Sequence, residues 1–297
     1  MQNILNDLKT ISINDYELIY TYLKNNNSEN CDYNICNIMS WGVIYKLEYS
    51  IYKNIIIFFN PEYNYLLFPE LENISEEELW QIFNVFKEKY SNVQITPLSY
   101  NHIKGLPDIH KYFNVVNDTD WNDYVYLAEN LVNLSGKKLA KKKNLISQFY
   151  RLYPDHKLVN ITKDDYIEIM DFYSKWQVTH DIKDEFLSVE VEATKIILQN
   201  WDLFPCRGVK LYANKVLCAY AVWSPQTADM ATVHFEKCDP KIKGSGQMIN
   251  YAVAKDIAME YTFVNREQDM GYEGIRHAKQ SYQPLRMVEF YKLSAKI

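Results

Sequence analysis

Hydrophobic and polar positions in the first 130 residues predict a mixed lobe in which strands dominate. After an amphipathic segment at Asp15–Lys24, the run KNIIIFFN at Lys53–Asn60 is typical of a buried strand, and Pro61 marks a turn. Ser75-Glu-Glu-Glu78 has the acidic first turn of a helix that we expect to reach Tyr90. Further strands are expected at residues 41–49, 65–68, 93–97, 113–117 and 124–126.

A lysine-dense segment separates the two halves of the chain. The stretch LSGKKLAKKKNLISQFYRLYP predicts a polar helix over residues 134–153 that ends before Pro154. We interpret this helix as a bridge between two domains. The predicted N-terminal domain spans residues 1–155 and includes the helix, and the C-terminal domain spans residues 156–297.

The second half has the order helix, helix, hairpin, strand, glycine loop, helix, strand, helix, strand. This order resembles that of the acetyltransferase superfamily. The helices are expected at residues 164–176, 187–201, 247–260 and 272–281, and the strands at residues 208–212, 216–223, 231–237, 262–266 and 287–293.

The glycine loop is a candidate anion site. It lies between a strand and a helix, where backbone N–H groups and the helix dipole favour a phosphate or pyrophosphate. The alternative is a plain turn that needs glycine only for its shape. The residues expected to bind a donor phosphate are Lys241, Lys243, Gly244, Ser245 and Gly246.

The strand before this loop carries two titratable side chains. Strand alternation places His234 and Glu236 on one face, where either of them can accept a proton from a substrate. The alternative is a half-buried strand with a hydrogen-bonded histidine and a salt bridge.

A second polar cluster follows the strand at residues 262–266. Arg276 and Lys279 share a helix face that suits an anionic group, whereas Asn265 and Glu267 share a strand face that suits an amine. The alternative is a salt-bridge network between the lobes. The expected substrate-binding residues are Lys237, Asn265, Arg266, Glu267, Asp269, Glu273, Arg276 and Lys279.

Composition narrows the class of protein. A length of 297 residues favours two lobes, and a net charge of -6 argues against a broad electrostatic hold on nucleic acid. The five cysteines are scattered, so we expect no metal site. The sequence has neither an apolar run of about 18 residues nor a signal peptide, so we expect a cytoplasmic protein without integral membrane association.

The lysine run is usually only a solvated face. As a functional feature, Lys137, Lys138 and Lys141 cluster on one side of the expected helix, where they would attract tRNA or anionic lipid headgroups.

Three segments together resemble a known family. LSGKKLAKKKNLISQF, VHFEKCDPKIKGSGQMIN and FVNREQDMGYEGIRHAKQSYQP are similar to proteins related to the C-terminal catalytic domain of phosphatidylglycerol lysyltransferase. The resemblance implies an α/β (α+β) fold of two tandem acetyltransferase-like (GNAT-like) lobes, as in the Fem aminoacyltransferases, each a mixed, mostly antiparallel sheet flanked by helices. It implies functional roles for His234, Glu236, Lys237, the glycine loop, Asn265, Arg266, Glu267, Asp269, Glu273, Arg276, Lys279 and Tyr282.

The leading hypothesis is therefore an acyltransferase or aminoacyltransferase. The donor would be an acyl-coenzyme A or an aminoacyl-tRNA, the acceptor a small molecule with an amine or hydroxyl, and no tightly bound cofactor is expected. His234 or Glu236 would accept the proton of the acceptor, and Tyr282 would protonate the leaving group. The alternative is a binding module that keeps the fold and binds a small ligand or nucleic acid without catalysis.

Overall fold

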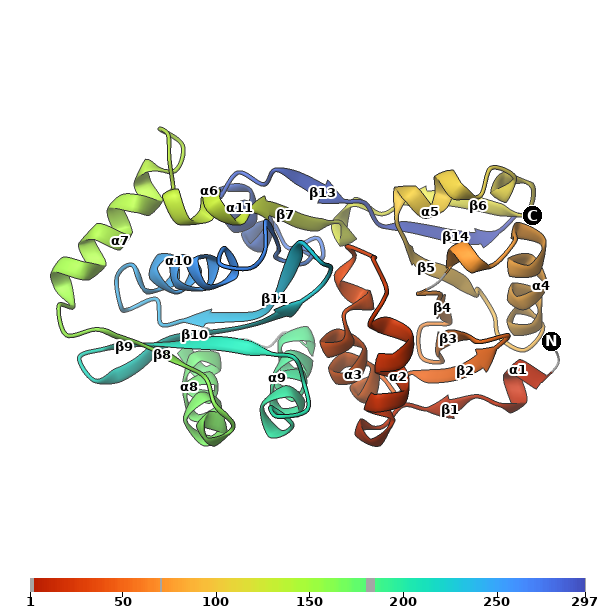
Figure 1. Ribbon diagram of the computed structural model, residues 1–297, viewed down its shortest axis with the longest axis horizontal. Coiled ribbons are helices and arrows are strands. Elements are labelled where there is room, and N and C mark those ends of the chain that lie inside the picture. Colours follow the sequence, from red (N-terminus) through yellow and green to blue (C-terminus); the bar gives the residue numbers. More distant parts are fainter. Residues whose placement is uncertain (1–2, 70, 180–184, 297) are drawn as a thin grey trace. The chain divides into compact units, whose positions relative to one another are not determined.

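The chain forms two compact units, shown in Figure 1 for a computed structural model that describes residues 3–69, 71–179 and 185–296. Unit 1 comprises residues 1–123 and 288–297, and unit 2 comprises residues 124–287. The predicted boundary after residue 155 is therefore misplaced. The lysine-dense helix is no bridge, because it packs within unit 2 against the helix that follows the glycine loop.

Unit 1 is built on a mixed sheet in which only two neighbouring strands are parallel, within the part of the chain described. The strand order is β1 (Lys9–Thr10), β2 (Glu48–Tyr52), β3 (Ile55–Asn60), β4 (Tyr65–Leu67), β5 (Gln94–Leu98), β14 (Tyr291–Ala295) and β6 (Phe113–Asn117). Its α-helices are α1 (Asn3–Asn6), α2 (Tyr16–Leu23), α3 (Ile35–Ile44), α4 (Glu76–Lys87) and α5 (Tyr100–Gly105). The parallel pair is β4 with β5.

The strand predicted at residues 41–49 is mostly wrong, and the strand predicted at residues 124–126 lies in the sheet of unit 2 instead of unit 1. Residues 41–44 end helix α3, and β2 begins only at Glu48. The Asn34 side chain caps this helix by accepting a hydrogen bond from the Cys36 N–H. Because seven residues of α3 are buried, including Asn37 and Ser40, its hydrophobic periodicity is hard to distinguish from a strand pattern.

Unit 2 is built on a second sheet, flanked by helices on both faces (Figure 1). The strand order is β13 (Arg286–Val288), β7 (Asp123–Leu127), β12 (Phe263–Asn265), β11 (Met230–Cys238), β10 (Val216–Pro225), β9 (Arg207–Ala213) and β8 (Lys157–Asn160). The helices are α6 (Ala128–Asn133), α7 (Ala140–Leu152), α8 (Tyr166–Thr179), α9 (Glu185–Gln199), α10 (Ser245–Ile257) and α11 (Glu273–Gln280).

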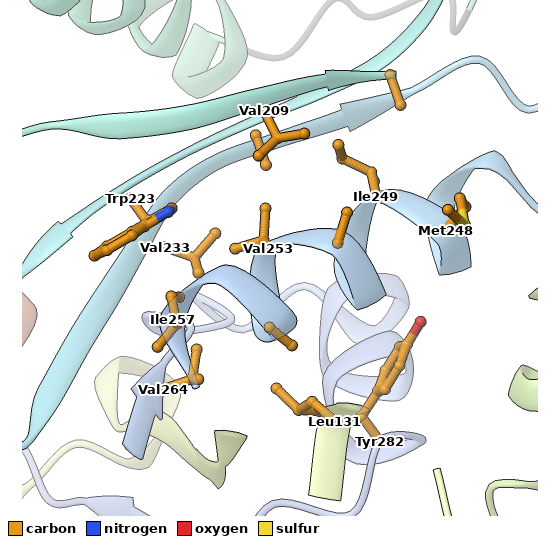
Figure 2. Packing of buried hydrophobic residues seen from close by; sticks show 14 of the residues in the cluster. Leu131, Val209, Trp223, Val233, Met248, Ile249, Val253, Ile257, Val264 and Tyr282 are labelled. Carbon is orange, nitrogen blue, oxygen red and sulfur yellow. The ribbon is translucent and has the colours of Figure 1, made fainter. Parts of the chain in front are cut away.

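Helix α10 forms the core of unit 2 with the sheet. Ile249, Val253 and Ile257 recur along one face of the helix and pack against Trp223 and Val233 of the sheet (Figure 2). Helices α6 and α7 contact α10, whereas α8 contacts β10 and β11 from the opposite face of the sheet (Figure 1). The four helices predicted in this half are confirmed.

The strand predicted at residues 287–293 is two strands in different sheets. Residues 286–288 form β13 in the sheet of unit 2, and residues 291–295 form β14 between β5 and β6 in unit 1. Hydrophobic periodicity does not reveal this exchange, because both pieces have the alternation of a half-buried strand. Within the described ranges, no helix combines the length and the apolar character needed to cross a bilayer.

Candidate active site

The polar residues of unit 2 gather where two parallel strands part. β11 pairs with β10 from Ala231 to Cys238, but it pairs with β12 only from Met230 to Thr232. Residues 233–238 of β11 therefore border a gap between the two segments, and the side chains of Arg266 and Glu267 reach across it to β11. In open α/β sheets, ligands bind beyond the carboxyl ends of parallel strands, so this gap is the natural place for a site.

The corresponding place in unit 1 is filled by a side chain. The Tyr33 hydroxyl donates a hydrogen bond to Pro97 O at 2.7 Å and accepts one from the Phe68 N–H at 3.3 Å. Tyr33 thus bridges the two chain segments beyond the short parallel pairing of β4 and β5. The gap in unit 2 is instead bordered by charged side chains.

A β-bulge at His234 changes which side chains share a face. Val222 pairs with Phe235 and Trp223 pairs with Val233, so His234 is the extra residue of β11. Val233 packs in the α10 core, and the Glu236 carboxylate accepts a hydrogen bond from Asn250 of α10. His234 instead contacts Ser224, which follows the core residue Trp223 and points to the other face. The prediction that His234 and Glu236 share a face is therefore wrong.

On the α10 face, one carboxylate holds an arginine and an asparagine. Glu236 Oε1 accepts a hydrogen bond from Arg266 Nη2 at 3.1 Å, and Glu236 Oε2 accepts one from Asn250 Nδ2 at 3.2 Å. The Glu236 side chain is 21% exposed and the Arg266 side chain 13% exposed. Arg266 Nη1 and Asn250 Oδ1 are buried and meet no hydrogen-bond partner among the described residues.

Two tyrosines complete this cluster, which we call the Glu236–Arg266 site. The Arg266 guanidinium lies 5.8 Å from the ring centroid of Tyr126 and 5.2 Å from that of Tyr282. Burial lowers the pKa of Arg266, but Glu236, Tyr126 and Tyr282 together outweigh this effect and raise it, so Arg266 stays cationic. Burial raises the pKa of Tyr282, which therefore keeps its proton at neutral pH.

On the opposite face, a histidine links a serine to a glutamate. His234 Nε2 lies 2.8 Å from Ser224 Oγ, and His234 Nδ1 lies 3.0 Å from Glu267 Oε1. The His234 side chain is only 1% exposed, whereas that of Glu267 is 20% exposed. A substrate would therefore meet Glu267 first, and His234 is better placed to orient Glu267 than to receive a proton from substrate directly.

The backbone of Glu267 adopts an uncommon conformation that several bonds hold in place. Its φ angle is 56°, a region that residues other than glycine rarely occupy. Asn265 Oδ1 accepts a hydrogen bond from the Glu267 N–H at 2.7 Å. Lys279 Nζ donates hydrogen bonds to the carbonyl oxygens of Glu267 and Gln268.

The next turn of this loop is held by a buried aspartate. Asp269 accepts two hydrogen bonds from Arg276, one from the Gly271 N–H, and one from the Tyr124 hydroxyl at 2.5 Å. Burial raises the pKa of Asp269, but these hydrogen bonds outweigh it and hold the pKa below its usual value. Arg276 and Lys279 thus bind the loop itself, and a role for them in holding an anionic substrate stays a prediction. All residues of this hydrogen-bond and salt-bridge network belong to unit 2.

The remaining substrate residues predicted from the sequence lie apart from the Glu236–Arg266 site. Lys237 Nζ forms an ion pair with both oxygens of Glu190 at 2.8 Å and lies 4.7 Å from the ring centroid of Trp176. These partners belong to α8 and α9, so Lys237 points to the face opposite Glu236. Glu273 is exposed in the first turn of α11, where the helix dipole stabilises its negative charge.

Close packing accounts for both glycines of the glycine loop. Gly244 caps α10 with a φ of 85°, and a Cβ there would lie 2.6 Å from the carbonyl oxygen of Leu145 in α7. A Cβ on Gly246 would lie 3.0 Å from Cys238 Sγ. Ser245 Oγ donates a hydrogen bond to Asp239 O, and Lys241 and Lys243 are exposed. Phosphate binding at this loop stays a prediction.

The lysine run is only partly helical. Helix α7 begins at Ala140, so Lys137 and Lys138 lie in the turn before it, and Lys141 is exposed in its first turn. Sequence reasoning treated the whole run as surface and missed Lys142, which is half-buried. It also missed Asn250, although a polar residue within the apolar stripe of the helix at residues 247–260 was a usable signal.

Comparison with known proteins adds a family and a fold. Residues 24–293 match the family described as "Phosphatidylglycerol lysyltransferase, C-terminal". An uncharacterized protein of Mycoplasmoides gallisepticum is 23% identical over 205 residues, which are 66% of this chain and 62% of that relative. The chain thus spans less than two thirds of the relative's length.

Several solved structures are similar to this chain in fold. A conserved protein of unknown function from Bacteroides thetaiotaomicron has a TM-score of 0.86 at 30% identity, covering 97% of this chain and 99% of its own. L-PGS from Bacillus licheniformis has a TM-score of 0.66 at 10% identity, covering 96% and 92% of the two chains. FemX has a TM-score of 0.60 at 7% identity, covering 97% and 96%. The fold is that of two tandem GNAT-like lobes, which confirms the expected fold class.

Proposed function

Because this chain belongs to the phosphatidylglycerol lysyltransferase C-terminal family, we propose that it transfers an aminoacyl group from aminoacyl-tRNA to a hydroxyl or amine acceptor. The reaction would take place in the gap between β11 and β12, at the Glu236–Arg266 site. A fold by itself hosts many activities, so the case depends on the side chains of that site.

The observation that carries the proposal is the pair of buried polar atoms beside Glu236. Arg266 Nη1 is a donor without an acceptor and Asn250 Oδ1 is an acceptor without a donor among the described residues, and both side chains bind the same carboxylate. Buried polar groups are nearly always paired, so such atoms point to a missing partner. An aminoacyl ester offers both partners, because its carbonyl oxygen accepts hydrogen bonds and its α-ammonium group donates them.

Each side chain then has a chemical role in direct transfer. Glu236 accepts the proton of the attacking hydroxyl or amine while the new bond forms at the ester carbonyl. Arg266 stabilises the negative charge that develops on the carbonyl oxygen. Tyr282 gives its proton to the leaving oxygen as the ester bond breaks. Asn250 holds the α-ammonium group, so the reacting carbonyl is positioned in the gap.

The packing of α7 favours an ester donor over an acyl-coenzyme A. A pyrophosphate at the glycine loop would need access to the N-terminus of α10, whereas the backbone of Leu145 lies directly against Gly244 there. The competing function is a module that binds an aminoacyl or amino-acid ligand without turnover. Such a module would use the same site, so only a transfer assay distinguishes it from an aminoacyltransferase.

The test is a transfer assay with tRNA charged with radiolabelled amino acids, offered to phosphatidylglycerol vesicles and to small amine or hydroxyl acceptors. We expect Glu236→Gln to lower the rate by about 100-fold or more, since it removes a proton acceptor. Glu260→Gln is the matched control, because Glu260 is an exposed partner of Arg207 on the surface. Melting curves of both variants separate lost catalysis from lost folding.

Full activity in Glu236→Gln would contradict the proposed mechanism. Binding of the charged tRNA without transfer to any acceptor would instead support the binding module.

A further inference from the structure

Lys142 of α7 lies beside the Glu236–Arg266 site. Lys142 Nζ donates a hydrogen bond to Ser281 Oγ at 2.7 Å and lies 4.1 Å from the ring centroid of Tyr282. Arg266 contacts the same Tyr282 ring at 5.2 Å. Lys142 is half-buried, whereas its neighbours Lys141 and Lys143 are exposed.

The local charge is positive. Lys142 and Arg266 carry two positive charges, and Glu236 carries the one negative charge that acts on both of them within the described residues. No carboxylate of the described residues forms an ion pair with Lys142, whose ammonium group binds a neutral hydroxyl. Holding a half-buried cation without a counterion is costly, so the site suits a ligand that brings a negative charge.

Donors are also available for such a ligand. An ammonium group has three N–H bonds, and the Lys142 ammonium uses one of them for Ser281. Arg266 Nη1 is a second donor, buried and without an acceptor among the described residues. Burial lowers the pKa of Lys142, and Arg266 and Lys141 lower it further, while Glu236 opposes them. An anion between Lys142 and Arg266 would relieve this repulsion.

We propose that Lys142 and Arg266 form a subsite for one anionic oxygen group, a carboxylate, a phosphate or the oxyanion of a tetrahedral intermediate. In the reaction, which depends on the proposed function, attack on the ester carbonyl forms the new bond and moves the carbonyl electron pair onto oxygen. Lys142 and Arg266 donate hydrogen bonds to that oxygen and keep their protons. When the electron pair on this oxygen forms the carbonyl bond again, the ester bond breaks and the leaving oxygen takes a proton from Tyr282.

Phosphate binding tests the subsite without any assumption about the reaction. Inorganic phosphate is titrated into the full chain by calorimetry at constant ionic strength. We expect Lys142→Met to weaken phosphate binding at least fivefold and Lys142→Arg to keep most of it. Ser281→Ala, which removes the hydroxyl that holds the ammonium, should weaken it partly. Lys255→Met is the control, because Lys255 is an exposed lysine on α10.

The transfer assay then separates the subsite from the proposed function. If transfer occurs, Lys142→Met should lower kcat by about 100-fold, as the loss of an oxyanion donor does elsewhere, with KM changed less than threefold. Phosphate binding that needs Lys142 in a protein without transfer activity would support the subsite and refute the function. Unchanged phosphate affinity in Lys142→Met, or equal weakening in Lys255→Met, would overturn the subsite. An unchanged kcat in Lys142→Met would overturn its role in catalysis.

Discussion

Replacing Gly244 by alanine should destabilise unit 2 through two separate costs. The first is the backbone conformation, since a φ of 85° costs an L-residue about 1–2 kcal/mol relative to glycine. The second is a steric clash, because the new Cβ would lie 2.6 Å from Leu145 O and 3.1 Å from Phe149 Cβ. Overpacking of this kind costs about 1–3 kcal/mol, so we expect a total of about 2–5 kcal/mol.

A second glycine of the same unit isolates the backbone cost. Gly136 has a φ of 87°, and a Cβ there would meet nothing within 4 Å. Gly136→Ala should therefore cost only about 1–2 kcal/mol. The difference between the two variants measures how closely α7 is packed on the cap of α10.

The assay is urea unfolding followed by circular dichroism, with hydrogen exchange of α10 as a local probe. With a slope of about 2 kcal/mol per molar urea, Gly244→Ala should lower the midpoint of the unit 2 transition by about 1 M or more. Equal losses in Gly244→Ala and Gly136→Ala would refute the close contact with Leu145. A stable Gly244→Ala variant that loses only ligand binding would favour a phosphate role for this loop instead.

Three further predictions concern stability. Gly274 lies in α11, and a Cβ added there would meet nothing within 4 Å. Because alanine has the higher helix propensity, Gly274→Ala should stabilise unit 2 by about 0.5–1 kcal/mol, as measured by urea unfolding. Asp269→Asn should destabilise unit 2 by about 2–3 kcal/mol at pH 7. Because the pKa of Asp269 is held below 3.8 in the folded protein, wild type loses this advantage as the carboxylate is protonated, so the difference in unfolding free energy should shrink as the pH falls below about 4. Unfolding curves at both pH values measure this difference. Tyr33→Phe should cost unit 1 about 1–3 kcal/mol by leaving Pro97 O and the Phe68 N–H unpaired, and a thermal melt equal to wild type would contradict this.

Periodicity predicted most helices and strands because most of them bury one face. Residues 247–260 carry apolar side chains at helical spacing, and α10 packs that face against the sheet. The pattern fails for α3, where polar Asn37 and Ser40 are buried as well. It also could not indicate that residues 286–288 and 291–295 join different sheets, since exchange of strands depends on tertiary pairing.

The sequence indicated several residues of the candidate site but not how their side chains are arranged. His234 and Glu236 are two residues apart, but the bulge places them on opposite faces, and no local pattern signals a bulge without glycine. Arg276 and Lys279 share a helix face as expected, but that face meets the loop at residues 267–269. The role of Lys142 depends on Ser281 and Tyr282, which are distant in sequence and only meet in the folded unit.

The position of β14 has a consequence for how the chain is made. Tyr291 pairs with Leu98 on one side and with Asn117 on the other, so an interior strand of the unit 1 sheet comes from residues that follow unit 2 in the sequence. Unit 2 is continuous from residue 124 to residue 287 and can gain its contacts as it leaves the ribosome. The earlier strands β5 and β6 must wait for β14, on the order of ten seconds or more at ordinary rates of synthesis. During that interval each has an open edge, which makes nascent unit 1 the part of the chain most exposed to mispairing with other strands.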